Sequence, residues 1–172
     1  MAFDGKAFSD YSVVALGPDV ADDEEAGRSF SRYLERVGSE QLLMKAPRPS
    51  ESAYAGSKAC ADCHGEAFKA WEGSGHAHAY ATLEGKGHSL DPDCVGCHVV
   101  GLDSTKGFRG RKDTPDLANV GCESCHGPAA QHAVSPMAAP MPKIGPESCA
   151  KCHEPENSPN FVFSTYWPKI RH

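Results

Sequence analysis

Cys60-Ala-Asp-Cys63-His64 is a five-residue pattern that occurs four times in the chain, and these copies decide the fold. Each copy places two cysteines three positions apart and a histidine directly after the second cysteine. The four copies use all 8 cysteines of the sequence. The other three are Cys94-Val-Gly-Cys97-His98, Cys122-Glu-Ser-Cys125-His126 and Cys149-Ala-Lys-Cys152-His153.

This spacing is typical of the attachment site of a c-type haem. Cysteines three positions apart lie one helical turn apart on the same side, so both thiols can form thioethers with one porphyrin edge. The histidine that follows supplies a nitrogen to the iron as the proximal ligand. The sequence therefore predicts four covalent haem c groups. Their attachment residues are Cys60, Cys63, Cys94, Cys97, Cys122, Cys125, Cys149 and Cys152, and their proximal ligands are His64, His98, His126 and His153.

Other uses of paired cysteines fit the pattern less well. Four cysteine pairs could form two zinc sites, but zinc does not require a histidine directly after every second cysteine. Disulfides would explain an even number of cysteines, but they would not produce a fixed five-residue unit. A thioredoxin-like redox pair needs an α/β context, which is missing here.

The composition offers little material for a protein core. Of 172 residues, 40% are apolar even with the cysteines included, 8% are aromatic, and glycine and proline number 17 and 13. The mean hydropathy is −0.47. Four porphyrins would supply the missing interior. We therefore expect a mainly α fold with little regular secondary structure, a multihaem c-type cytochrome organised around four covalently bound haems. Its apo-protein should be largely unfolded.

Several functional classes are excluded or made unlikely by the sequence. No stretch is long and apolar enough to span a membrane. The formal charge of −6 argues against nucleic acid as the main partner. Met1 is not followed by the basic and apolar stretches of a secretory signal peptide. Because covalent haem attachment takes place outside the cytoplasm, we expect a periplasmic or extracytoplasmic protein whose signal peptide is not part of this chain.

The chain has two compositional parts, because all cysteines and histidines follow residue 59. Residues 1–50 are predicted to be an N-terminal extension, with a short strand over 11–16 and an acidic amphipathic helix from Asp19 to about Lys45. Residues 51–172 are predicted to form the tetrahaem domain. Within it we expect helices over 57–71 and 76–83, a polar loop over 103–119 and an extended segment over 138–146.

Five histidines remain for the sixth position of the four irons, namely His76, His78, His88, His132 and His172. This count predicts that most of the haems have two histidine ligands, an arrangement that favours low-spin iron. Methionine is the rival ligand and would raise the reduction potential. Met137 and Met141 precede the fourth motif, but filling or surface roles are favoured for them.

Residues 54–172 resemble the tetrahaem cytochrome c-554 family. Four stretches carry the resemblance: Trp71-Glu-Gly-Ser74-Gly-His76, Cys97-His98-Val-Val-Gly101, Gly121-Cys122-Glu-Ser-Cys125-His126-Gly127-Pro128 with His132, and Phe161-Val-Phe-Ser-Thr-Tyr166-Trp-Pro-Lys-Ile170-Arg-His172. The resemblance implies that His76, His132 and His172 are distal ligands. It also implies that the second haem, on Cys94 and Cys97, is five-coordinate.

The sequence departs from the family pattern by carrying His78 and His88. His88 lies six residues before Cys94 and is the better candidate for a fourth distal ligand. His78 is only two residues from His76, so it would point elsewhere on a helix. Residues 1–50 in turn resemble the C-terminal end of a metallophosphatase domain of the kind fused to such cytochromes. The metal-binding motifs of that enzyme are absent, so no phosphatase activity is expected.

The leading functional prediction is electron transport along four closely spaced, mostly bis-histidine haems, with no catalytic residue. The family resemblance implies redox partner proteins, among them a multihaem hydroxylamine-oxidising enzyme. Two alternatives remain. A five-coordinate second haem could reduce a small molecule such as nitric oxide. A homo-oligomer could instead form a conductive filament in which a neighbouring copy donates one distal histidine.

Overall fold

The structure is a computed structural model that describes residues 2–3, 5 and 8–172, and it divides into two compact units, Met1–Tyr33 and Leu34–His172. In the first unit β1 (Ala2–Phe3) pairs antiparallel with β2 (Phe8–Asp10). The strand predicted over 11–16 is wrong, because these residues form no regular structure. Their large apolar side chains are exposed, so no packing partner holds them in a sheet.

The predicted N-terminal helix is divided into two. Helix α1 (Glu24–Ser39) begins later than Asp19, because the Asp23 carboxylate accepts a hydrogen bond from the Ala26 N–H at 2.8 Å and caps the helix there. Gln41 then adopts a left-handed conformation with φ 54°, and this residue separates α1 from α2 (Leu42–Lys45). The apolar stripe of α1 contributes one buried residue, Val37.

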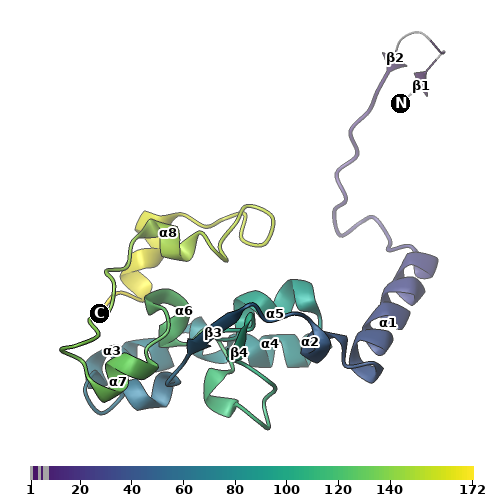
Figure 1. The fold of residues 1–172 in the computed structure, drawn as a ribbon. Helices are drawn as coiled ribbons and strands as arrows, with labels where there is room; N and C mark the ends of the chain where they lie inside the picture. The colour runs from purple at the N-terminus through teal and green to yellow at the C-terminus, as the bar shows by residue number, and fades with distance from the viewer. Residues whose placement is uncertain (1, 4, 6–7) are drawn as a thin grey trace. The chain divides into compact units, whose positions relative to one another are not determined.

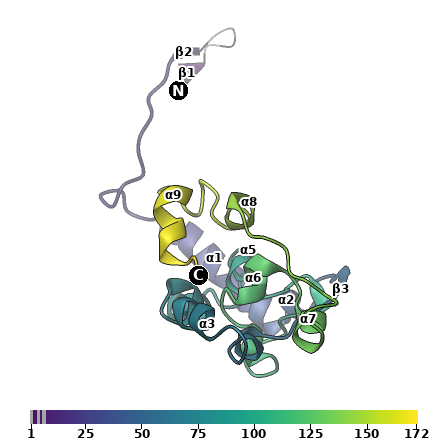
Figure 2. The same cartoon turned by 90° about the vertical axis from the view of Figure 1, so that its left-hand side faces the viewer.

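The second unit consists of short helices and turns joined by irregular segments (Figures 1 and 2). One small parallel sheet pairs β3 (Ser50–Ala53) with β4 (Ser104–Lys106). The helical elements are η1 (Ser57–Cys60), α3 (Gly65–Glu72), η2 (Gly75–His78), α4 (Ala79–Lys86), α5 (Pro92–His98), η3 (Pro115–Leu117), α6 (Cys122–His126), α7 (Ala130–Val134), α8 (Pro146–Cys149), α9 (Phe163–Tyr166) and η4 (Trp167–Lys169).

The helices expected over 57–71 and 76–83 are each interrupted. The first divides into η1 and α3, because the first haem motif forms its own turn between them. The second divides into η2 and α4. The loop expected over 103–119 contains β4 and η3 as well as irregular chain. Of the extended segment expected over 138–146, residues 140–145 have no helix or strand, but 138 and 139 form a turn and a bend and Pro146 begins α8.

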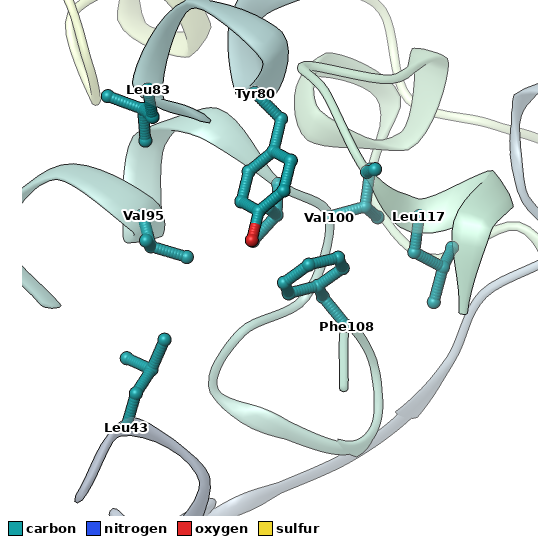
Figure 3. Close-up of a cluster of buried hydrophobic side chains, with 9 residues drawn as sticks. Leu43, Tyr80, Leu83, Val95, Val100, Phe108 and Leu117 are labelled. Carbon is teal, nitrogen blue, oxygen red and sulfur yellow. The ribbon is translucent and has the colours of Figure 1, made fainter. Parts of the chain in front are cut away.

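The apolar core is small and surrounds the second haem motif. Figure 3 shows its main side chains, with the rings of Tyr80 and Phe108 at the centre. These two rings meet edge to face with centroids 5.2 Å apart, and the Tyr80 hydroxyl donates to the Ser89 carbonyl at 3.0 Å. Val95, inside the motif helix α5, is fully buried. The cluster also contains Leu43, Leu83, Val99, Val100, Leu117 and Ala118.

A tight backbone crossing closes the loop that brings Phe108 into this core. The Phe108 N–H donates to the Val100 carbonyl at 3.0 Å. A Cβ atom added to Gly107 would lie 1.6 Å from the Gly101 carbonyl oxygen, so only glycine fits at position 107. Gly101 itself has φ 66°, and a Cβ there would meet the Tyr54 ring at 2.2 Å. In the described part of the chain, no helix has the length and apolar character to cross a bilayer.

Candidate haem-binding site

Each of the four motifs forms a single helical turn. The second and third motifs lie in α5 and α6. In the first and fourth motifs the histidine N–H donates to the carbonyl of the first cysteine, from His64 to Cys60 at 2.8 Å and from His153 to Cys149 at 2.9 Å. The two cysteines of a motif therefore lie on the same side of one turn. No disulfide joins any two of the eight cysteines.

Three of the four motif histidines face a second histidine from elsewhere in the chain. The ring centroids are 6.2 Å apart for His64 and His132, 6.0 Å apart for His153 and His76, and 5.9 Å apart for His126 and His172. Imidazole nitrogens bind a first-row metal ion at about 2 Å, so rings on opposite sides of one iron have centroids about 6 Å apart. The observed separations match this requirement.

Hydrogen bonds fix one ring in each of these pairs through its Nδ1 atom. His132 donates to the Ala139 carbonyl at 2.8 Å, and His172 donates to the Ile170 carbonyl at 3.1 Å. His153 contacts the Ser158 hydroxyl at 3.0 Å and stacks on Phe161 with a centroid distance of 4.4 Å. Fixing Nδ1 in this way leaves Nε2 as the metal-binding atom.

Burial also favours the ligating form of three histidines. Desolvation lowers the pKa of His76, and the neighbouring His153 lowers it further. The pKa of His126 is lowered by burial first and then by His172 and His64, and burial alone lowers the pKa of His153. A lower pKa keeps an imidazole neutral near pH 7, which is the form that binds a metal ion.

Two hydrogen bonds connect His76 to the chain beside the third motif. The Val120 N–H donates to the His76 carbonyl at 3.1 Å, and the Trp71 indole donates to the Val120 carbonyl at 2.8 Å. Trp71 and His76 belong to one of the stretches that carry the family resemblance. Trp71 therefore fixes the segment that follows α3 against Val120.

The second motif is arranged differently. His98 donates from Nδ1 to the Ala79 carbonyl at 2.7 Å, and within the described residues it makes no ring contact with another histidine. His88 lies beside the first cysteine of this motif instead. Its Nδ1 atom is 3.2 Å from the Asp91 carboxylate, and ligand atoms of His88, Asp91 and Cys94 lie within 4.8 Å of one another. His78 is exposed.

An apolar cavity of about 310 Å³ lies between the first and third motifs. Its wall includes the paired histidines of both motifs, together with Phe68, Trp71 and Met141. Met137, the other methionine considered above, is 96% exposed. Apolar walls, thiols on single turns and opposed imidazoles are the donor set and shape that a covalently bound haem requires. The residues present therefore fit the group.

The motifs are neighbours in two pairs. The side chains of Cys60 and Cys122 interact, which brings the first motif against the third. The side chains of Cys97 and Cys152 interact likewise, which brings the second motif against the fourth. The spacing of the motifs along the sequence carries no signal for this pairing.

The sequence also gave no indication of the residues that support the ligands. The Ala79 and Ala139 carbonyls act through the backbone, so their residue type carries no signal. Ser158 and Phe161, which contact His153, lie in an irregular segment without periodicity. Glu123 is a buried carboxylate inside the third motif, at a position where the motif accepts any residue. A charged residue between the two cysteines does not single it out, because the first and fourth motifs carry Asp62 and Lys151 between theirs.

Comparisons with known proteins agree with this site. Residues 59–127 match the model of the family described as cytochrome c554 and c-prime. The chain is similar to cytochrome c-554 of Nitrosomonas europaea, with 34% identity over 94 residues, 46% of this chain and 40% of that protein. It is also similar to the C-type polyheme cytochrome OmcB of Geobacter sulfurreducens, with 33% identity over 88 residues, 48% of this chain and 12% of that protein.

A solved structure shows the same fold. The reduced state of cytochrome c554 from Nitrosomonas europaea aligns with a TM-score of 0.50 and 24% identity, over 71% of this chain and 85% of that chain. This match confirms the predicted mainly helical fold with little strand, and the family match over residues 59–127 agrees with a multihaem c-type cytochrome. The matched stretch spans less than half of the curated cytochrome c-554. The haem-motif region of this chain, residues 59–127, is thus similar to the cytochrome c554 and c-prime family, and this similarity supports covalently bound haem c.

Proposed function

We propose that the chain binds four haems c and carries electrons between redox partner proteins. The eight motif cysteines attach the haems, and His64, His98, His126 and His153 are the proximal ligands. The opposed rings support a distal histidine ligand for three of the haems. His132 serves the first haem, His172 the third and His76 the fourth.

The observation that carries this proposal is the pairing of rings. Each of the three close pairs joins a motif histidine to a histidine outside the motifs, at 5.9 to 6.2 Å. Surface histidines without a common ligand would not be expected to do so three times. The haem irons supply reversible one-electron oxidation and reduction. The protein holds both axial nitrogens in place, so a change of oxidation state needs little rearrangement.

The proximity of the haem motifs to one another supports electron transfer through the molecule. Because Cys60 interacts with Cys122, and Cys97 with Cys152, the attachment edges of the first and third haems, and of the second and fourth, are neighbours. Cys125 is also close enough to Cys149 for its charge to raise the Cys125 pKa, after the larger effect of burial. This proximity relates the third motif to the fourth and brings the two pairs near each other.

An intact mass and absorption spectra test the proposal. The mass of the purified holoprotein should exceed that of the polypeptide by four haems, because all eight thiols are consumed. The oxidised spectrum should be predominantly low-spin, because three haems have two imidazole ligands. A mass without haem, with eight titratable thiols, would refute the proposal.

A second function is favoured by the arrangement of His98. Its ring faces no other histidine in the described part of the chain, so a sixth position remains for a small molecule such as nitric oxide. We propose this position as a binding site on the second haem. Carbon monoxide should then bind to the reduced protein at one haem. If His88 is the distal ligand instead, wild-type protein should ignore carbon monoxide, and His88→Ala should gain the binding.

The periplasm is the compartment that this chemistry favours, because covalent haem attachment occurs outside the cytoplasm. A multihaem oxidoreductase is the proposed electron donor, in line with the family resemblance. Mixing the oxidised holoprotein with such an enzyme and its substrate should reduce the haems at a rate that falls with ionic strength, since acidic surfaces steer the encounter. Unchanged absorbance after mixing would argue against this partner class.

A further inference from the structure

Glu123 is a buried carboxylate in the wall of the cavity between the first and third motifs. Glu123 is only 4% exposed and lines this cavity. Three backbone N–H groups donate to it, from Ala129 at 2.7 Å, Gly56 at 2.8 Å and Ala55 at 2.9 Å. Across the described residues, no lysine, arginine or histidine forms an ion pair with it. The three N–H groups therefore stabilise the negative charge.

The donors come from both sides of the first haem site. Ala55 and Gly56 directly precede the first motif, and the Gly56 carbonyl accepts a hydrogen bond from the Cys60 thiol at 3.9 Å. Ala129 directly precedes α7, which carries His132 opposite His64. Glu123 itself lies between the cysteines of the third motif. One carboxylate thus joins the third motif, the approach to the first motif and the helix that bears the opposing ligand.

We propose that Glu123 is a positioning residue for the first and third haems and that its charge lowers their reduction potentials. The inference rests on the proposed function. The hydrogen bond from Ala129 holds the start of α7, and those from Ala55 and Gly56 hold the approach to the first motif, so together they keep His132 opposite His64. A negative charge in an apolar wall also stabilises the more positive, oxidised state of a haem bound beside it, because the surroundings screen it less than water does.

The test is a redox titration of the holoprotein with Glu123→Gln. The amide has nearly the same size but no charge. The midpoint potentials of two haems should therefore rise, while those of the other two stay unchanged. Asp62→Asn is the matched control. It makes the same charge change inside the first motif, but Asp62 is exposed, so solvent screens it and the potentials should move less.

A second variant separates position from charge. Glu123→Asp keeps the charge on a shorter side chain, so it should increase the high-spin fraction in the electron paramagnetic resonance spectrum by loosening His132. Potentials that match wild type in Glu123→Gln would overturn the electrostatic role. If Glu123→Gln yields no holoprotein, the Glu123→Asp variant provides the test. An electron paramagnetic resonance spectrum of Glu123→Asp that matches wild type would overturn the positioning role. A wild-type mass lacking four haems would refute the proposed function instead.

Discussion

The nine histidines of this chain differ in what their rings contact. His132 faces the motif residue His64 and is anchored through Nδ1 to the Ala139 carbonyl. His78 is exposed and pairs with no histidine ring among the described residues. Only the first arrangement holds a nitrogen where an iron between the two rings would need it. Residue type alone did not distinguish these two histidines, whereas their surroundings do.

The His132→Ala variant should convert one low-spin haem to high spin, because the ring opposite His64 is lost. Electron paramagnetic resonance of the oxidised protein measures this as the loss of one low-spin component and the gain of a high-spin signal. The His78→Ala variant is the control and should leave the spectrum unchanged. An unaltered spectrum in the His132→Ala protein would contradict the proposed pairing.

Two glycines should respond in opposite ways to alanine. In Gly107→Ala the new Cβ would lie 1.6 Å from the Gly101 carbonyl oxygen, and the variant should lose about 3 kcal/mol of unfolding free energy. Gly85 lies within α4 with nothing within 4 Å of an added Cβ. Gly85→Ala should gain up to about 1 kcal/mol, because alanine is the better helix former. Thermal unfolding of the two holoproteins compares their stabilities. Equal unfolding midpoints would contradict the close approach of Gly107 to the Gly101 carbonyl.

Local signals predicted the helical character of α1 to α4 and failed at the ends of these helices. The acidic cluster correctly indicated a helix start, but Asp23 caps it rather than Asp19. The break at Gln41 depends on one left-handed residue, and glutamine is not a type that favours this conformation. β4 was missed because its pairing with β3 joins segments that are distant in sequence. Pairings of this kind have no local pattern.

Helix α5 depends on its cap for the position of the second motif. The buried Asp91 carboxylate accepts from the Asp93 N–H at 3.1 Å and contacts His88. Asp91→Ala should therefore lower the unfolding free energy by about 1 to 2 kcal/mol. Asp93→Ala, an exposed change in the same turn, should cost only about 0.5 kcal/mol through the helix dipole. Chemical denaturation of both holoproteins measures these unfolding free energies. An equal decrease in the two variants would show that the Asp91 cap has no special role.

The described part of the molecule has a small protein core, so we expect its folding to depend on its cofactors. The buried apolar cluster is confined to the surroundings of the second motif. Around the first and third motifs the interior is instead a cavity lined by ligands and thiols. The composition predicted this shortage, and the four motifs predict that haem fills it. The sequence could not predict which distant histidine opposes which motif, because that depends on the tertiary arrangement.

Protein produced without haem attachment should therefore be largely unfolded. Its far-ultraviolet circular dichroism should show little helix and no cooperative thermal transition, whereas the holoprotein should show both. The comparison needs reduced thiols, so that disulfides do not replace the missing links. A colourless sample that unfolds cooperatively would show that the polypeptide supplies its own core.

The side-by-side placement of Cys60 with Cys122, and of Cys97 with Cys152, has a consequence for biogenesis. Each of the first two motifs has a neighbour that follows later in the chain. A polypeptide that ends after its second motif would therefore lack the neighbouring motif of both, and we expect it to assemble poorly.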